Sequence, residues 1–130
     1  TFHDNMNKMF EHTSPTEIYK LIAKALQTNE GLILYLVAEA SIEPNSVYLH
    51  QIWKYSQNNN IEDLFKRSLV YGVNYNNGNT PFHNATQVGC LENIYLIKSL
   101  VDPSEMTRQN KKGDTPFSLA KIKLGVDIAI

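Results

Sequence analysis

The feature that most constrains this chain of 130 residues is a short motif that occurs twice. Residues 78–85 read Gly-Asn-Thr-Pro-Phe-His-Asn-Ala, and residues 113–120 read Gly-Asp-Thr-Pro-Phe-Ser-Leu-Ala. Glycine tolerates the positive φ of a tight turn, and Thr-Pro fits the cap and first residue of a helix. Helix starts that recur every 20–50 residues or so are typical of stacked repeats, whose units bury apolar faces only against their neighbours. We therefore expect function to reside on an extended surface.

The apolar pattern predicts short helices, joined alternately by short and longer connections. The expected helices span residues 14–28, 30–40, 47–56, 61–71, 81–88 and 91–100, and a last one starts at Pro116. Gly72 is predicted to end the fourth of these in the left-handed conformation, and Gly89 to form the turn after the fifth. Because no alternating, strand-length segment stands out, the expected fold class is all-α.

Composition excludes several classes of protein. A formal net charge of −1 gives no general electrostatic basis for nucleic-acid binding. Residues 31–40 form the best apolar run, which is too short to span a bilayer, so membrane insertion is not expected. A single Cys excludes an internal disulfide.

The two motifs and their surroundings resemble the ankyrin repeat family. That family's unit is a β-turn, then Gly-x-Thr-Pro-Leu-His-x-Ala opening an inner helix, a Gly turn, an outer helix and a Gly-Ala-Asp-x-Asn tail. Residues 78–85 match the opening with Phe in place of Leu, and Gly89 matches the turn. Residues 69–76 are similar to the tail of a preceding unit, with Val and Asn replacing Ala and Asp.

Two further units are less regular. Leu49-His50 precedes Phe82-His83 by thirty-three residues, which indicates a diverged unit, and the last unit has Ser118 where the family has His. The resemblance implies an all-α, ankyrin-repeat solenoid of stacked helix-turn-helix units. Residues 1–43 are expected to form an N-terminal helical lead-in or capping hairpin, and residues 44–130 the repeats. A further degenerate unit over residues 14–43 is the alternative. The expected units are about 44–76, 77–110 and a partial 111–130.

The His and Cys residues are candidates for metal ligands or catalytic groups, but each has a simpler structural interpretation. The resemblance implies that His50 and His83 are structural, their rings bonding loop backbone and tying successive units together. His3 and His12 add no ligand set, so neither a metal nor another cofactor is expected. Cys90 stands at a helix start, but a nucleophilic pair with His83 lacks an orienting third residue, and an ordinary, partly buried thiol is favoured. No catalytic residue is identified, and the chain is not expected to be an enzyme.

Trp53 and a cluster of basic residues each allow two interpretations. Trp53 either fills space between units or is an exposed anchor for a partner, with packing favoured. The basic cluster is interpreted as the solvated face of the last repeat rather than a nucleic-acid or phosphoinositide site. It comprises Arg108, Lys111, Lys112, Lys121 and Lys123.

The resemblance also implies where a partner binds, because turn tips and inner-helix faces line a concave groove in the family. The positions of this chain that map there are Glu43, Ser46, Tyr75, Asn76, Asn77, Asn79, Gln87, Val88, Lys111, Lys112 and Asp114. Tyr75 is either an exposed contact or a local change in packing. The central stretch is polar and nearly uncharged, which predicts recognition by hydrogen bonds and shape rather than by steering.

The function that the resemblance implies is a non-enzymatic, monomeric domain that binds a protein partner in the cytoplasm. Its composition and diverged units are similar to ankyrin proteins of intracellular bacteria or large DNA viruses. That similarity suggests an effector that engages a host protein in the host cytosol. One alternative is a targeting or assembly module of a larger enzyme or channel. Another is that residues 1–43 are the effector element and the repeats its scaffold.

Overall fold

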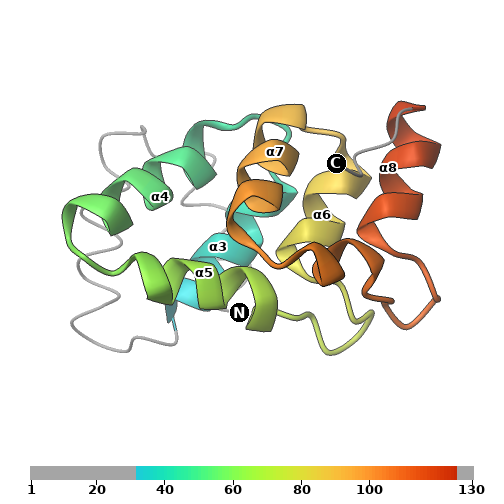
Figure 1. Ribbon diagram of the computed structural model, residues 1–130, viewed down its shortest axis with the longest axis horizontal. Coiled ribbons are helices and arrows are strands. Elements are labelled where there is room, and N and C mark those ends of the chain that lie inside the picture. Colours follow the sequence, from blue (N-terminus) through green and yellow to red (C-terminus); the bar gives the residue numbers. More distant parts are fainter. Residues whose placement is uncertain (1–31, 126–130) are drawn as a thin grey trace.

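A computed structural model describes residues 32–125, and this part of the chain is all-helical (Figure 1). Its elements are α3 (Leu32–Ile42), α4 (Val47–Asn58), α5 (Glu62–Tyr71), α6 (Pro81–Val88), α7 (Leu91–Leu100), the 3-10 helix η1 (Pro103–Thr107) and α8 (Pro116–Leu124). The predicted helices that fall in this range are confirmed, and no strand occurs in it. The helix predicted over residues 14–28 lies outside the described residues.

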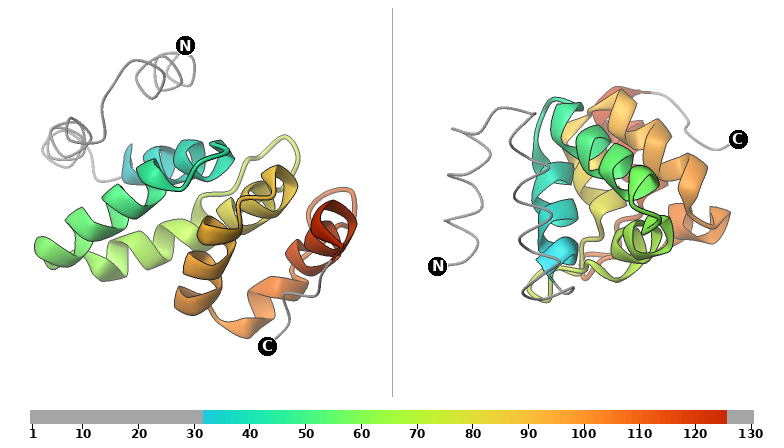
Figure 2. Two further views of the ribbon diagram at one scale, coloured as in Figure 1. Left: turned by 90° about the horizontal axis from the view of Figure 1, so that it is seen from above. Right: turned by 90° about the vertical axis from the view of Figure 1, so that its left-hand side faces the viewer.

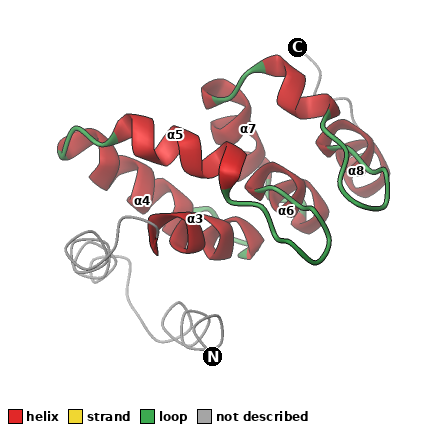
Figure 3. Cartoon of the chain, turned by 90° about the horizontal axis from the view of Figure 1, so that it is seen from below, coloured by secondary structure: helices red, strands yellow, loops and turns green. Residues whose placement is uncertain are grey.

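The helices are arranged in two layers. One layer is a row in which α6 packs between α3 and α8 (Figure 2). The other layer contains α5 against α3, α7 against α6, and η1 against α8 (Figure 3). The remaining helix, α4, packs against α3 and α5 at one end. The loops that enter α6 and α8 project on the same side of the molecule (Figure 3).

Both copies of the motif start a helix in the predicted way. The Thr80 hydroxyl accepts a hydrogen bond from a backbone N–H of the first turn of α6, and Pro81 is the first residue of the helix. Thr115 and Pro116 have the same roles in α8. Each start is a capping box, in which the third helical residue bonds back to the cap. The motif thus satisfies backbone donors that a helix start would leave unpaired.

Glycine is required at these positions for two different reasons, a positive φ or the lack of a side chain. Gly78, Gly113 and Gly89 have φ values of +74°, +83° and +82°, as the predicted turns require. The prediction that Gly72 ends α5 in the left-handed conformation is wrong, because its φ is −75°. A Cβ atom on Gly72 would lie 2.6 Å from the carbonyl oxygen of Ser68. This site therefore requires glycine for its lack of a side chain.

The core lies between the two layers. Its fully buried large side chains are Ile33, Leu49, Ile52, Phe65, Leu69, Phe82, Ile94 and Ile97. Trp53 of α4 is half-buried and packs on Phe65 of α5, with ring centroids 5.0 Å apart. Of the two interpretations of Trp53, packing is therefore the one that the structure supports.

The row of helices differs from the expected arrangement at one place. The unit predicted over residues 44–76 would place the helix of Leu49-His50 beside α6, but α3 takes that position. The reason is that α3 is apolar on several sides and packs against α4, α5 and α6, whereas α4 has a polar face. His50 differs from His83 accordingly: its Nδ1 lies 2.8 Å from the Ser46 carbonyl oxygen, at the start of its own helix.

Candidate functional site

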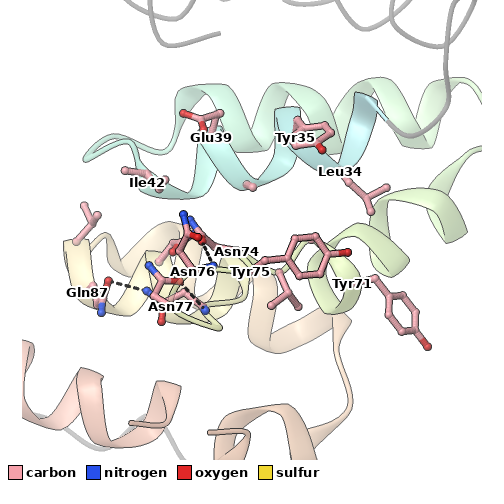
Figure 4. Close-up of a pocket in the computed structure, with 16 residues that line it drawn as sticks. Leu34, Tyr35, Glu39, Ile42, Tyr71, Asn74, Tyr75, Asn76, Asn77 and Gln87 are labelled. Carbon is pink, nitrogen blue, oxygen red and sulfur yellow. Dashed lines mark hydrogen bonds between the residues drawn. The ribbon is translucent and has the colours of Figure 1, made fainter. Parts of the chain in front are cut away.

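An open groove of about 750 Å³ lies between α3, the loop of residues 73–79 and α6 (Figure 4). The side chains of α3 form one wall, and the loop tip with the exposed side of α6 forms the other. Its lining comprises Leu34, Tyr35, Ala38, Glu39, Ile42, Tyr71, Gly72, Val73, Asn74, Tyr75, Asn76, Asn77, Asn79, Asn84, Gln87 and Val88. Glu39 is the one acidic residue of this set, which contains no Lys, Arg or His. The groove is therefore aromatic and amide-rich.

Three tyrosines from separate elements give the groove its aromatic surface (Figure 4). Tyr75 in the loop is 88% exposed, Tyr71 at the end of α5 is 67% exposed, and Tyr35 on α3 is 44% exposed. The exposure of Tyr75 shows that it does not change local packing, so it is available as a contact. Exposed aromatic side chains that surround a groove are typical of binding surfaces.

The loop tip holds its shape through its own asparagines. The backbone N–H of Asn76 donates to Asn74 Oδ1 at 2.8 Å, and the N–H of Asn79 donates to Asn77 Oδ1 at 2.9 Å. The loop is closed by two backbone bonds, from Asn74 N to the Asn79 carbonyl and from Gly78 N to the Asn74 carbonyl. Asparagine suits such turns because its side chain replaces a backbone acceptor.

Asn79 is a structural residue, contrary to the prediction that it contacts a partner. It is 4% exposed. Its Oδ1 accepts from Asn110 Nδ2 at 2.8 Å, and its Nδ2 donates to Gln87 Oε1 at 3.2 Å. Asn110 in turn accepts the N–H groups of Lys112 and Asp114 on its Oδ1. A chain of amides thus connects the groove to the next loop.

The structure brings together only part of the predicted site. The groove contains Tyr75, Asn76, Asn77, Asn79, Gln87 and Val88. The residues outside its lining are Glu43, Ser46, Lys111, Lys112 and Asp114. Lys111 nevertheless supports the loop, since its N–H donates to the Asn77 carbonyl at 2.9 Å and its Nζ contacts the Tyr75 carbonyl. The next loop therefore acts on the groove through backbone contacts.

Sequence reasoning missed the whole α3 wall. The contact positions that the resemblance implies begin at Glu43, so they do not include Leu34, Tyr35, Ala38 and Ile42. A signal was present, because Tyr35, Ala38 and Ile42 follow helical spacing on a segment that is apolar on its other sides as well.

His83 is fully buried and engaged on both ring nitrogens. Nδ1 accepts from the Thr80 N–H at 3.1 Å, and Nε2 lies 2.9 Å from the Arg108 carbonyl and 3.1 Å from that of Asp114. Burial lowers the pKa of His83 below its ordinary value of 6.5, although the two carbonyls act in the opposite direction. Its ring is thus part of the framework and is not presented to a ligand.

Cys90 precedes α7 and is buried. Burial raises the pKa of its thiol above the ordinary value, so the helix start does not activate it. Its Sγ lies 3.6 Å from Glu92 Oε2, whose charge raises the pKa further. This environment is that of an unreactive thiol.

Among residues 32–125 there is no group of three or more His, Cys, Asp or Glu side chains that could hold a metal ion. The same part of the chain has no helix long and apolar enough to cross a membrane. Comparison with known proteins finds no family model, curated protein or solved structure that matches this chain.

Proposed function

We propose that this chain is an ankyrin-repeat domain that binds a protein partner through the groove between α3 and the loop of residues 73–79. The repeat assignment is supported by the two capped helix starts, the positive-φ turns and the two-layer packing of α6, α7, η1 and α8. His83 supports it further, because its ring joins the start of α6 to the loop that precedes α8.

The observation that carries the binding role is the groove itself. Five predicted contact positions, apart from the buried Asn79, line one surface together with two further exposed tyrosines, Tyr35 and Tyr71. The lining contains no Ser, Thr, Cys, Lys or His, and Glu39 provides its one carboxylate. We therefore propose a non-enzymatic role, with recognition by aromatic contact and hydrogen bonds.

The setting we propose is the cytosol of a host cell, with the chain acting as an effector of an intracellular bacterium or virus. The asparagine-rich composition and the diverged unit predicted over residues 44–76 are the features that suggest it. Finding the parent gene in a genome without host-cell association would contradict this part. The second candidate, a targeting module of a larger enzyme or channel, would be favoured by a catalytic domain elsewhere in the full-length gene.

Photocrosslinking tests the binding surface directly. A photoreactive amino acid in place of Asn76 lies in the groove, where that side chain is exposed. The matched control places it at Tyr95, which is 55% exposed on α7 outside the groove. We expect a specific cytosolic protein to be crosslinked from position 76 and not from position 95. Crosslinking only from position 95 would show that the partner uses another face.

A further inference from the structure

Three of the amide side chains that line the groove, Asn74, Asn77 and Gln87, present mainly one kind of hydrogen-bonding group. Backbone N–H groups can only donate, so the atoms they meet on Asn74 and Asn77 are the Oδ1 oxygens. The Oε1 of Gln87 is likewise used, as the acceptor for Asn79 Nδ2 (Figure 4). The acceptor atoms of three lining amides are therefore already engaged.

The NH2 groups of the same three side chains have no hydrogen-bond partner among the described residues. Asn74 and Gln87 are exposed and Asn77 is half-buried, so these groups face solvent or the groove. The part of a ligand that faces these three side chains thus meets donors and must supply acceptors. A ligand donor that faced them would lose a hydrogen bond that it had in water. Asn76, also in the lining, offers both an acceptor and a donor.

The charge of the groove lining indicates which kind of acceptor group a ligand would carry. The lining has a carboxylate, Glu39, and no cationic side chain, so it does not complement an anion. An uncharged acceptor fits better, and the backbone carbonyl of an extended peptide is such a group. An ordinary peptide also presents as many N–H donors, whereas proline has a carbonyl and no N–H.

The aromatic surface fits the same ligand. Tyr35, Tyr71 and Tyr75 offer exposed rings along the groove. Polyproline II segments dock on aromatic-lined grooves, and their backbone carbonyls are free because the helix has no internal hydrogen bonds. Their stiffness also reduces the entropy that binding costs.

We propose that the groove binds a proline-rich segment in the polyproline II conformation, with its carbonyls toward Asn74, Asn77 and Gln87 and its rings against the tyrosines. This inference rests on the proposed function, since it assigns a ligand class to the same groove.

Nuclear magnetic resonance of the 15N-labelled chain tests it with decaproline as the probe. We expect the side-chain NH2 signals of Asn74, Asn77 and Gln87 to shift in a saturable manner. A decapeptide of alternating Gly and Ser is the flexible control and should produce no saturable shift. A decaglutamate peptide tests the anionic alternative. Binding of decaglutamate as tightly as decaproline would overturn the proposal.

The sharpest variant is the double substitution Asn74→Asp with Asn77→Asp. Each Asp keeps the oxygen that the loop backbone needs but removes the NH2 donors, so the turns are retained. Each lost bond is worth a factor of roughly 2–10 in affinity, so we expect loss of the two donors to weaken binding of decaproline by about 4- to 100-fold. Circular dichroism should show an unchanged thermal midpoint. Unchanged affinity in this folded variant would overturn the donor assignment.

Two tyrosine variants test whether decaproline binds in the groove or elsewhere on the surface. Tyr75→Ala should weaken decaproline binding about tenfold, and Tyr95→Ala should leave it unchanged. A protein crosslink from position 76 combined with no decaproline shift would overturn this inference and leave the proposed function standing.

Discussion

The Nε2 atom of His83 lies 3.1 Å from the carbonyl oxygen of Asp114, a residue of the second motif. On its other side, Nδ1 accepts from the Thr80 N–H at 3.1 Å, so the proton of the neutral ring is on Nε2. One imidazole therefore satisfies a backbone N–H at the start of α6 and a carbonyl of the loop before α8.

Replacing His83 should destabilise the fold more than replacing His50. The change His83→Ala leaves a cavity and unpaired buried groups at Thr80, Arg108 and Asp114, and we expect it to lower the free energy of unfolding by about 3 kcal/mol. His50→Ala removes one bond within its own helix from a half-buried position and should cost less than about 1 kcal/mol. Urea unfolding measures both, and equal losses would contradict the bridging role.

Stability should fall as the solution is acidified below pH 6.5. The pKa of His83 is lowered in the folded state, so the unfolded chain binds more protons, and stability rises with pH in this range. The stabilisation is complete above the unfolded value of 6.5 and is lost as pH falls below it toward the folded value. Subtracting the profile of His83→Gln from that of the wild type isolates this group from other titrating residues. A flat difference between pH 8 and pH 5 would show that His83 does not contribute.

The two motif glycines should respond differently to the same change. Gly78 and Gly113 both have positive φ, so alanine costs about 1 kcal/mol at either. A Cβ on Gly78 would also lie 2.9 Å from the backbone nitrogen of Lys111, whereas one on Gly113 meets nothing within 4 Å. We expect Gly78→Ala to lower the free energy of unfolding by about 1–3 kcal/mol more than Gly113→Ala. Thermal unfolding of the two variants measures the difference, and equal midpoints would contradict the close approach of the loops.

The thiol of Cys90 should react slowly in the folded protein. It is buried and its pKa is raised, so little thiolate is present or accessible at pH 7.5. Because it is the single Cys of the chain, the colour released from an aromatic disulfide reagent reports on it alone. We expect the rate to be at least about tenfold lower in buffer than in urea. A native rate equal to or above the urea rate would indicate an activated thiol.

The sequence predicts local structure well here because the relevant signals are short-range. A Thr-Pro pair provides the hydroxyl for a cap and the missing N–H of a first turn, wherever the helix later packs. Gly89 is similar, since its φ of +82° depends on the turn alone. These features need no knowledge of neighbours.

Which helix packs where was not predictable in the same way. The motif fragment Leu49-His50 suggested that α4 would lie beside α6. In the structure the more apolar α3 packs against α6 instead. The burial of Asn79 depends on a hydrogen bond from Asn110, thirty-one residues further on. No local sequence pattern predicts that contact. The groove was therefore predicted from its loop side only.

The amide chain from Gln87 through Asn79 to Asn110 has a consequence for how such a surface can change during evolution. The loop of residues 73–79 and the loop that contains Asn110 must be inherited together, because Asn110 supplies the hydrogen-bond donor that fixes Asn79. Recombination that transferred residues 73–79 into another scaffold without Asn110 would transfer the residues but not their geometry. The groove surface can therefore change most readily by substitution at Tyr75 and Asn76, which are exposed and whose side chains are not part of this chain of amides.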